Sequence, residues 1–179
     1  VMSELGDRMP RTLELAILAI VLSVIFSVPL GVISAIKPDS WLDFGARTFT
    51  IVGIAIPNFL MAVLMIIFLL TVFNWLPPLG YVELWDNPIK NMQQMIFPAI
   101  ALAIYDMAFI ARVTRSSMME VLREDYMRTA RAKGLSERVV LVRHGLKNAF
   151  LPILTISGWQ FARLFEGAVI IETIFLIPG

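Results

Sequence analysis

Four long apolar segments, separated by shorter polar stretches, dominate the pattern of this chain. A helix needs about 20 predominantly apolar residues, with a range of roughly 17 to 25, to cross the hydrocarbon core of a bilayer. Each segment reaches that range, so the pattern predicts an all-α, polytopic membrane protein with about four transmembrane helices. The predicted spans cover residues 12–36, 48–73, 95–111 and 149–171.

The longest polar stretch lies between the third and fourth segments and is basic, with its centre at residues 124–152. Apolar residues recur at helical spacing over about 117–133, which predicts a short amphipathic helix. Gly134 then suits the left-handed position that follows a helix end. Ser136 suits the cap of a second short helix that runs towards Pro152. We therefore expect two short helices that project from the membrane.

In the first apolar segment, small residues recur four positions apart and form one ridge along the predicted helix. They are Ala19, Ser23, Ser27, Gly31 and Ala35. Helices in lipid associate through close van der Waals packing, which small residues allow. We interpret the ridge as a packing surface for another helix; chance is the alternative, because membrane helices are rich in small residues.

Polar residues inside the second and third segments are candidates for contact with a solute. Pro57 and Asn58 predict either a packing kink or part of a passage, and the kink is slightly favoured. Asp106 is expected to face protein or water, because an ionisable group is costly in lipid. It either lines a translocation path or, as we favour, forms a structural hydrogen bond to a neighbouring helix or lies near Arg112.

The fourth segment contains two charged residues, Arg163 and Glu166, which lie three positions apart on one face of the predicted helix. Either they form an ion pair that stabilises assembly, or they face a solute in a wet cavity, and the sequence favours neither. Together with Asn58 and Asp106, they form the candidate set for a translocation path.

Composition and charge placement agree with a membrane protein. Hydrophobic residues make up 58% of the 179 residues and charged residues only 16%, and the mean hydropathy is +0.79. Basic residues gather in 112–148, whereas 74–94 contains only Lys90, so the positive-inside rule places 112–148 in the cytoplasm. Glu4 and Asp7 argue against a signal peptide, and the abrupt ends suggest a fragment.

The basic stretch also contains a motif that resembles the cytoplasmic loop of ABC-importer permeases. The general pattern of that family loop is E-A-A, three further residues, Gly, and then I-x-L-P. The matching positions are Arg128, Thr129, Ala130, Gly134, His144 and Leu146. Arg128 replaces the glutamate, and Lys147 stands at the proline position. Both departures resemble the peptide/nickel branch, with T-A-R-A-K-G-L followed by R-H-x-L-x-N-A.

Shorter matches extend the resemblance over the whole chain: R-M-P-R-T-L at 8–13, I-P-N-F at 56–59 and E-T-I-F-L-I-P-G at 172–179. The chain thus resembles a fragment of a permease subunit of a peptide/nickel-type ABC importer. The resemblance implies one partial transmembrane domain over 1–179, a type I importer (MetI-like) bundle with two short coupling helices, and an inner-membrane location. It also implies one further helix before the fragment and one after it.

The resemblance further implies a set of partners: a second permease subunit, two ATP-binding subunits, an extracytoplasmic solute-binding protein and membrane lipid. ATP would be hydrolysed on the partner subunits, so we expect this chain to be no enzyme and to bind no cofactor. The residues expected to contact the ATPase follow one another in the loop: Tyr126, Arg128, Thr129, Ala130, Arg131, Ala132, Lys133, Gly134 and Leu135.

The sequence has no catalytic or metal-binding pattern. It lacks a G-x-x-x-x-G-K-[ST] phosphate loop and cysteine, and its one histidine, His144, has no accompanying ligands. The basic stretch could bind nucleic acid or anionic lipid, but its amphipathic helices and interleaved acidic residues favour a protein partner. The alternative function is a membrane channel or scaffold that ATP does not drive. The resemblance leaves the cargo open among dipeptides, oligopeptides, nickel chelates and oligosaccharides.

Overall fold

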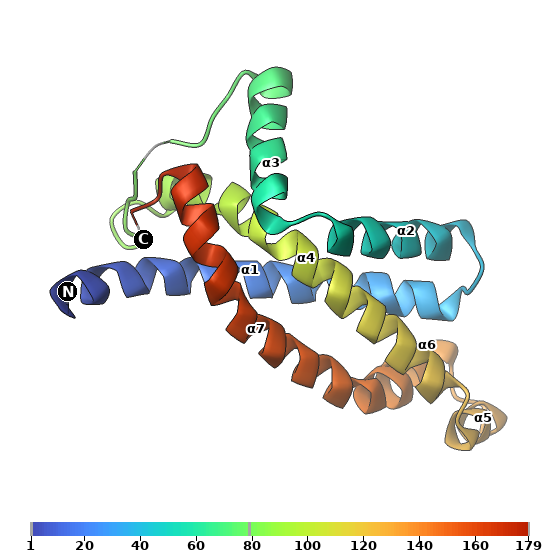
Figure 1. Ribbon diagram of the computed structural model, residues 1–179. Coiled ribbons are helices and arrows are strands. Elements are labelled where there is room, and N and C mark those ends of the chain that lie inside the picture. Colours follow the sequence, from blue (N-terminus) through green and yellow to red (C-terminus); the bar gives the residue numbers. More distant parts are fainter. Residues whose placement is uncertain (1, 79, 179) are drawn as a thin grey trace. The chain divides into compact units, whose positions relative to one another are not determined.

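The computed structural model describes residues 2–78 and 80–178, with side chains from Arg8 onward. Every regular element in these ranges is a helix, which confirms the all-α prediction (Figure 1). In chain order the elements are α1 (Met2–Ile36), α2 (Trp41–Ala55), α3 (Asn58–Phe73), α4 (Pro88–Leu122), α5 (Asp125–Ala132), α6 (Glu137–Val139), the π-helix η1 (Val140–Leu146) and α7 (Lys147–Phe175).

Within the described residues, three helical runs are long and apolar enough to cross a membrane: Arg8–Ile36, Pro88–Leu122 and Glu137–Phe175. The pair α2 and α3 meets the same criterion as one broken span, which raises the number of candidate spans to four. A multi-pass membrane protein is therefore what the described part of the chain supports.

The second apolar segment is divided into two helices at residues 56 and 57. Pro57 adopts an extended conformation, with φ −61° and ψ 145°, and forms the N-cap of α3. Proline has no backbone N–H and disfavours a helical conformation in the residue before it. The chain thus has a complete break where the sequence predicts a kink, and α2 begins at Trp41 rather than near residue 48.

The first short helix of the basic stretch does not cover 117–133 as predicted. Residues 117–122 continue α4, which extends the third apolar segment at both ends. The chain then turns at Glu124, whose extended backbone (ψ 147°) forms the N-cap of α5, and Asp125 stands in the first turn of that helix. An acidic residue is favourable at a helix N-terminus. A new helix therefore begins at Asp125, although the amphipathic pattern runs on through this position without a break.

The second helix of the basic stretch is also longer than expected. Ser136 occupies the predicted N-cap position, with ψ 144°, but its side chain makes no capping hydrogen bond. From Glu137 the chain stays helical through α6, η1 and α7, and Pro152 lies inside α7 rather than at a helix end. Proline is tolerated inside membrane helices when neighbouring groups satisfy the freed backbone.

The chain divides into two compact units, and α1, α4 and α7 each contribute to both. Unit 1 contains the chain up to Ser23, Ala55–Asp106 and the chain from Gln160. Unit 2 contains Val24–Ile54 and Met107–Trp159.

In unit 1, polar side chains fasten neighbouring segments to one another. The Ser23 hydroxyl lies 2.8 Å from the Ala19 carbonyl oxygen and 3.2 Å from that of Ala103, and so links α1 to α4. The Tyr81 hydroxyl donates to Glu14 Oε2 at 2.6 Å and fastens the loop before α4 to α1. Burial, and after it the bond to Glu14, raises the pKa of Tyr81 above its usual value, so the phenol stays a donor.

In unit 2, a buried carboxylate joins three helices. Asp43 at the start of α2 is completely buried and accepts from Arg115 of α4, Nε at 2.8 Å and Nη2 at 3.0 Å. It also accepts from the Ser34 hydroxyl of α1 and the Asp39 backbone N–H, and lies 3.1 Å from Arg47 Nη2. These donors offset the large cost of burying a charge.

The predicted small-residue ridge is confirmed, since all five of its members are buried. In unit 2 its member Gly31 lies directly against α4. A Cβ at that position would lie 2.7 Å from the Ala111 carbonyl oxygen and 2.6 Å from the Thr114 Cβ. Glycine is therefore required there by close approach between helices.

We predict that Gly31→Ala lowers the free energy of unfolding of the complete subunit by about 1–3 kcal/mol, because a backbone oxygen cannot give way to the added methyl group. Gly45→Ala is the matched control, since a Cβ there meets nothing within 4 Å. Alanine also favours a helix, so the control is expected to be neutral or slightly stabilising. Unfolding in detergent measures both variants, and equal effects would contradict the packing role.

Candidate functional site

All four residues predicted to line a translocation path lie around one pocket of unit 1, which has a volume of about 280 Å³. Asn58 comes from α3, Asp106 from α4, and Arg163 and Glu166 from α7. The fold thus brings together polar residues that the sequence distributes over three separate apolar segments.

Two backbone features position these residues. The break at Pro57 makes Asn58 the first residue of α3. Gly167 lets α7 lie close to α4 and α3, because a Cβ there would lie 2.8 Å from Leu102 Cδ1 of α4 and 3.1 Å from Asn58 Nδ2 of α3. Any larger residue at 167 would push on both neighbouring helices.

Asp106 is 3% exposed and is held by a neighbouring helix. Gln160 Nε2 of α7 donates to Asp106 Oδ1 at 2.5 Å. The structural hydrogen bond favoured from the sequence is therefore present. The partner was missed, although Gln160, Arg163 and Gly167 recur at helical spacing on one face, which is the signal that could have found it.

Arg163 is directed to an aromatic ring of α4. Its Nη1 donates to the Tyr105 hydroxyl at 3.3 Å, and its guanidinium carbon lies 5.2 Å from the centre of the same ring. A guanidinium at that distance from an aromatic face is attracted by the ring. No ion pair within 4.0 Å joins Arg163 to Glu166, so the mutual pair that the sequence allowed is not formed. The role of Tyr105 has no signal in the sequence pattern.

Arg163 and Glu166 both remain exposed on their helix. Charged groups in the middle of an apolar helix are expensive in lipid and face water or protein instead. The pocket therefore combines a guanidinium, an exposed carboxylate, a buried hydrogen-bonded carboxylate and the amide of Asn58. Such a set of donors and acceptors suits water or a polar solute.

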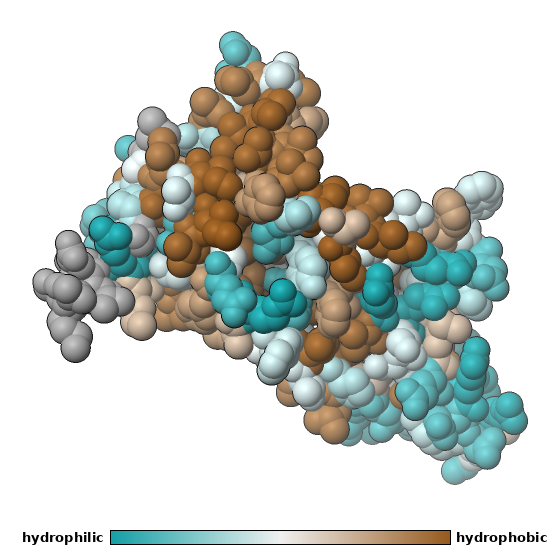
Figure 2. All heavy atoms as spheres, viewed as in Figure 1, coloured by the Kyte–Doolittle hydropathy of each residue, from teal (hydrophilic) through white to brown (hydrophobic). Residues whose placement is uncertain are grey.

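The residues predicted to contact an ATPase lie on α5 and the turn that follows it, past the C-terminal end of α4 (Figure 1). Met127 and Ala130 form the buried face of α5 and pack with Val140 of η1. Hydrophilic residues gather over this end of unit 2 (Figure 2). The other eight predicted residues are exposed: Tyr126, Arg128, Thr129, Arg131, Ala132, Lys133, Gly134 and Leu135.

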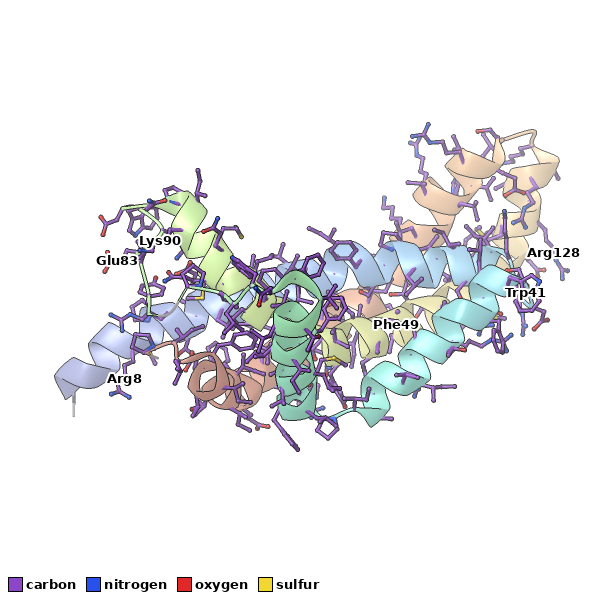
Figure 3. The ribbon with its side chains drawn as sticks, turned by 90° about the horizontal axis from the view of Figure 1, so that it is seen from above. Arg8, Trp41, Phe49, Glu83, Lys90 and Arg128 are labelled. Atoms are coloured by element: carbon purple, nitrogen blue, oxygen red, sulfur yellow. The ribbon has the colours of Figure 1, made fainter. Side chains whose placement is uncertain are left out.

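Ala130 differs from the rest of the predicted set. It is 6% exposed and contributes to the small core under α5, so it holds the helix in place rather than presenting a contact. Arg128, by contrast, extends from α5 with a side chain that is 76% exposed (Figure 3). Its 3.6 Å pair with Asp125 is also exposed, and such pairs contribute little to stability.

The turn after α5 has the predicted conformation at Gly134, whose φ is +77°. The Gly134 N–H donates to the Arg131 carbonyl oxygen at 2.9 Å. Across the turn, Arg131 Nε donates to Glu137 Oε1 at 2.7 Å, which joins α5 to α6. A left-handed backbone is adopted readily by glycine and at a cost by residues with a branched Cβ.

Comparisons with known proteins agree on one family. Residues 27–179 match the model of the binding-protein-dependent transport system inner membrane component family. The chain is 42% identical over 175 residues to the oligopeptide transport system permease protein AppB of Bacillus subtilis (strain 168), covering 96% of this chain and 55% of the relative. It is 44% identical over 170 residues to the dipeptide transport system permease protein DppB of the same strain, covering 95% and 53%.

The chain therefore spans just over half the length of these curated relatives. Among solved structures, a chain in a crystal structure of an amino acid ABC transporter with histidines is similar, with a TM-score of 0.61 and 19% identity. The likeness covers 92% of this chain and 68% of that one, and it confirms the predicted fold class.

We predict that Gln160→Leu lowers the free energy of unfolding by about 1–3 kcal/mol, because the Asp106 carboxylate then stays buried without its donor. Asp106→Asn is the control, since an amide oxygen can still accept from Gln160 while the buried charge is removed. The midpoint of unfolding of this control in detergent should equal or exceed that of the wild type. A wild-type midpoint for Gln160→Leu would show that this hydrogen bond is dispensable.

Proposed function

The chain belongs to the family of binding-protein-dependent transport system inner membrane components. We therefore propose that it is part of a permease subunit of an ABC importer, in which ATP drives transport. Peptides or related solutes are the proposed cargo, as the names of the relatives AppB and DppB suggest. In this proposal the chain hydrolyses no ATP and binds no cofactor itself. The resemblance found in the basic motif is confirmed at the level of the family.

The proposed partners are a second permease subunit, two ATP-binding subunits, a solute-binding protein outside the membrane, and lipid. Exposed apolar side chains over α3, such as Phe59, Ile67 and Phe68, suit lipid or a second permease subunit (Figure 2). The proposed site is the inner membrane, with residues 112–148 on the cytoplasmic side, because positive charge is concentrated there.

The observation that carries the proposal is the construction of α5. Its apolar face is anchored on η1 through Met127, Ala130 and Val140, while its polar face is left open. A helix anchored in this way can receive a partner on its open face and transmit a displacement through its packed face. Since η1 continues directly into α7, a displacement of α5 by an ATPase would reach the helix that carries Arg163 and Glu166.

The translocation path is proposed to run past the unit 1 pocket. Arg163 and Glu166 are exposed within an apolar helix, and water or a polar solute would meet their requirement for a polar environment. Displacement of α7 would then change the accessibility of this pocket, in the manner of a rigid-body switch.

We predict that Gly134→Val uncouples ATP hydrolysis from transport. A valine at φ +77° costs roughly 1–2 kcal/mol of backbone strain, which is released by moving the exposed surface of α5. Transport per ATP hydrolysed should fall by about fivefold or more, measured with the complete subunit and its ATPase in proteoliposomes.

The matched control is Gly134→Asn, because asparagine tolerates the left-handed conformation and the position has open space around it. It should keep near-wild-type transport. Equal transport by the valine variant would count against the coupling role. Failure of the complete subunit to co-purify with any ATP-binding subunit would instead favour the channel or scaffold.

The charges of the unit 1 pocket can be tested separately from α5. Glu166→Gln and Arg163→Gln should each lower solute uptake severalfold while binding of the ATPase is unchanged, because the charges lie in the pocket and not on α5. Val169→Ala is the control, as it is 60% exposed on the same helix and does not line the pocket. Wild-type uptake by both charge variants would place the path elsewhere.

A further inference from the structure

Unit 2 contains a second pocket, of about 380 Å³, formed by α1, α2 and α4. Its charged lining residues are Arg47 of α2 and Arg112 and Arg115 of α4, and no acidic side chain lines it. It shares no residue with the unit 1 pocket or with α5. The role of this basic pocket is not accounted for by transport or by coupling.

The guanidinium groups of this pocket are only partly neutralised. Arg115 uses Nε and Nη2 on Asp43, and Arg47 uses Nη2 on Asp39 and Asp43. Arg112 is exposed and makes no hydrogen bond or ion pair within the described residues. Three cations thus face two carboxylates, which leaves one positive charge in surplus.

The free donors suit a phosphate group. Arg112 offers its whole guanidinium fork, Nη1 of Arg115 has no acceptor among the described residues, and the exposed Ser116 hydroxyl lines the same pocket. Guanidinium forks bind phosphate oxygens through paired, charge-assisted hydrogen bonds. A phosphodiester carries a single negative charge, which equals the surplus of this pocket.

Most of the remaining wall is apolar and is formed by Gly31, Ala46, Ala111 and Ile51, of which Ile51 is 63% exposed. Two hydroxyl groups also line the pocket, but Ser34 donates to Asp43 and Thr50 donates to the Arg47 carbonyl oxygen. An amphiphile can place its phosphate on the arginines and its apolar part along Ile51, whereas a free phosphate ion gains nothing from these walls. Basic pockets between membrane helices are known to hold anionic headgroups.

We propose that this pocket binds the phosphate of an anionic phospholipid headgroup, with Arg112 as the principal contact. A zwitterionic lipid is disfavoured, because its choline group would bring a further cation next to the three arginines. The proposal requires only the unit 2 fold and a membrane, so it stands or falls independently of the transport function.

The test measures lipid binding to the complete subunit in neutral detergent by native mass spectrometry, with phosphatidylglycerol, phosphatidylcholine and inorganic phosphate as separate probes. Phosphatidylglycerol should bind with at least about tenfold higher affinity than phosphatidylcholine. Arg112→Gln should reduce that affinity by about tenfold through loss of charge-assisted hydrogen bonds. Ser116→Asp, which places a carboxylate in the pocket, should reduce it as well.

The matched control is Arg123→Gln, which removes an exposed arginine just after α4 that does not line the pocket. It should bind phosphatidylglycerol like the wild type. Equal losses for Arg112→Gln and Arg123→Gln would overturn the proposal in favour of a general charge effect. Displacement of the lipid by millimolar inorganic phosphate would overturn it in favour of a soluble anion, and equal binding of both lipids would overturn it altogether.

Discussion

The cost of placing charge inside an apolar helical bundle governs how this chain is built. Asp43 is completely buried and is surrounded by donors from three helices, which makes it a structural joint of unit 2. Asp106 is nearly buried and is held by Gln160. Arg163 and Glu166 instead remain exposed in the middle of α7. Charges that serve the fold are thus buried with partners within the chain, whereas the two charges that we propose for the translocation path stay exposed.

Features that depend on neighbouring positions along the chain could be predicted from the sequence. The spacing of Gly31 and its small neighbours is visible in one apolar segment, and the same face is buried in the structure. Gly134 follows a short amphipathic pattern, and its backbone is left-handed as expected. Asn58 and Asp106 were each recognisable as polar residues in apolar surroundings, because such residues need a partner or water wherever they lie.

Features that depend on distant positions could not be predicted in the same way. Asp43 and Arg115 are 72 positions apart, and each lies outside the predicted spans. Tyr105 is an ordinary residue for a membrane helix until Arg163 is known to face it. The end of α4 was placed wrongly because the amphipathic pattern continues across Glu124, where only the backbone conformation separates two helices. Packing determines which residues pair across helices, and the pattern along the sequence contains no information about that packing.

The π-helix η1 has a geometric consequence for α7. Its hydrogen bonds reach one residue further along the chain than those of an α-helix, so each of its turns holds more residues. The side chains that follow η1, from Lys147 onward, are therefore rotated about the helix axis. The rotation is measured against the positions they would have if the chain were one regular α-helix from Glu137. The seven residues of η1 thus set the direction in which the side chains of the first turns of α7 point. The length of this one segment determines their orientation, and loss of a single residue there would rotate those side chains about the helix axis.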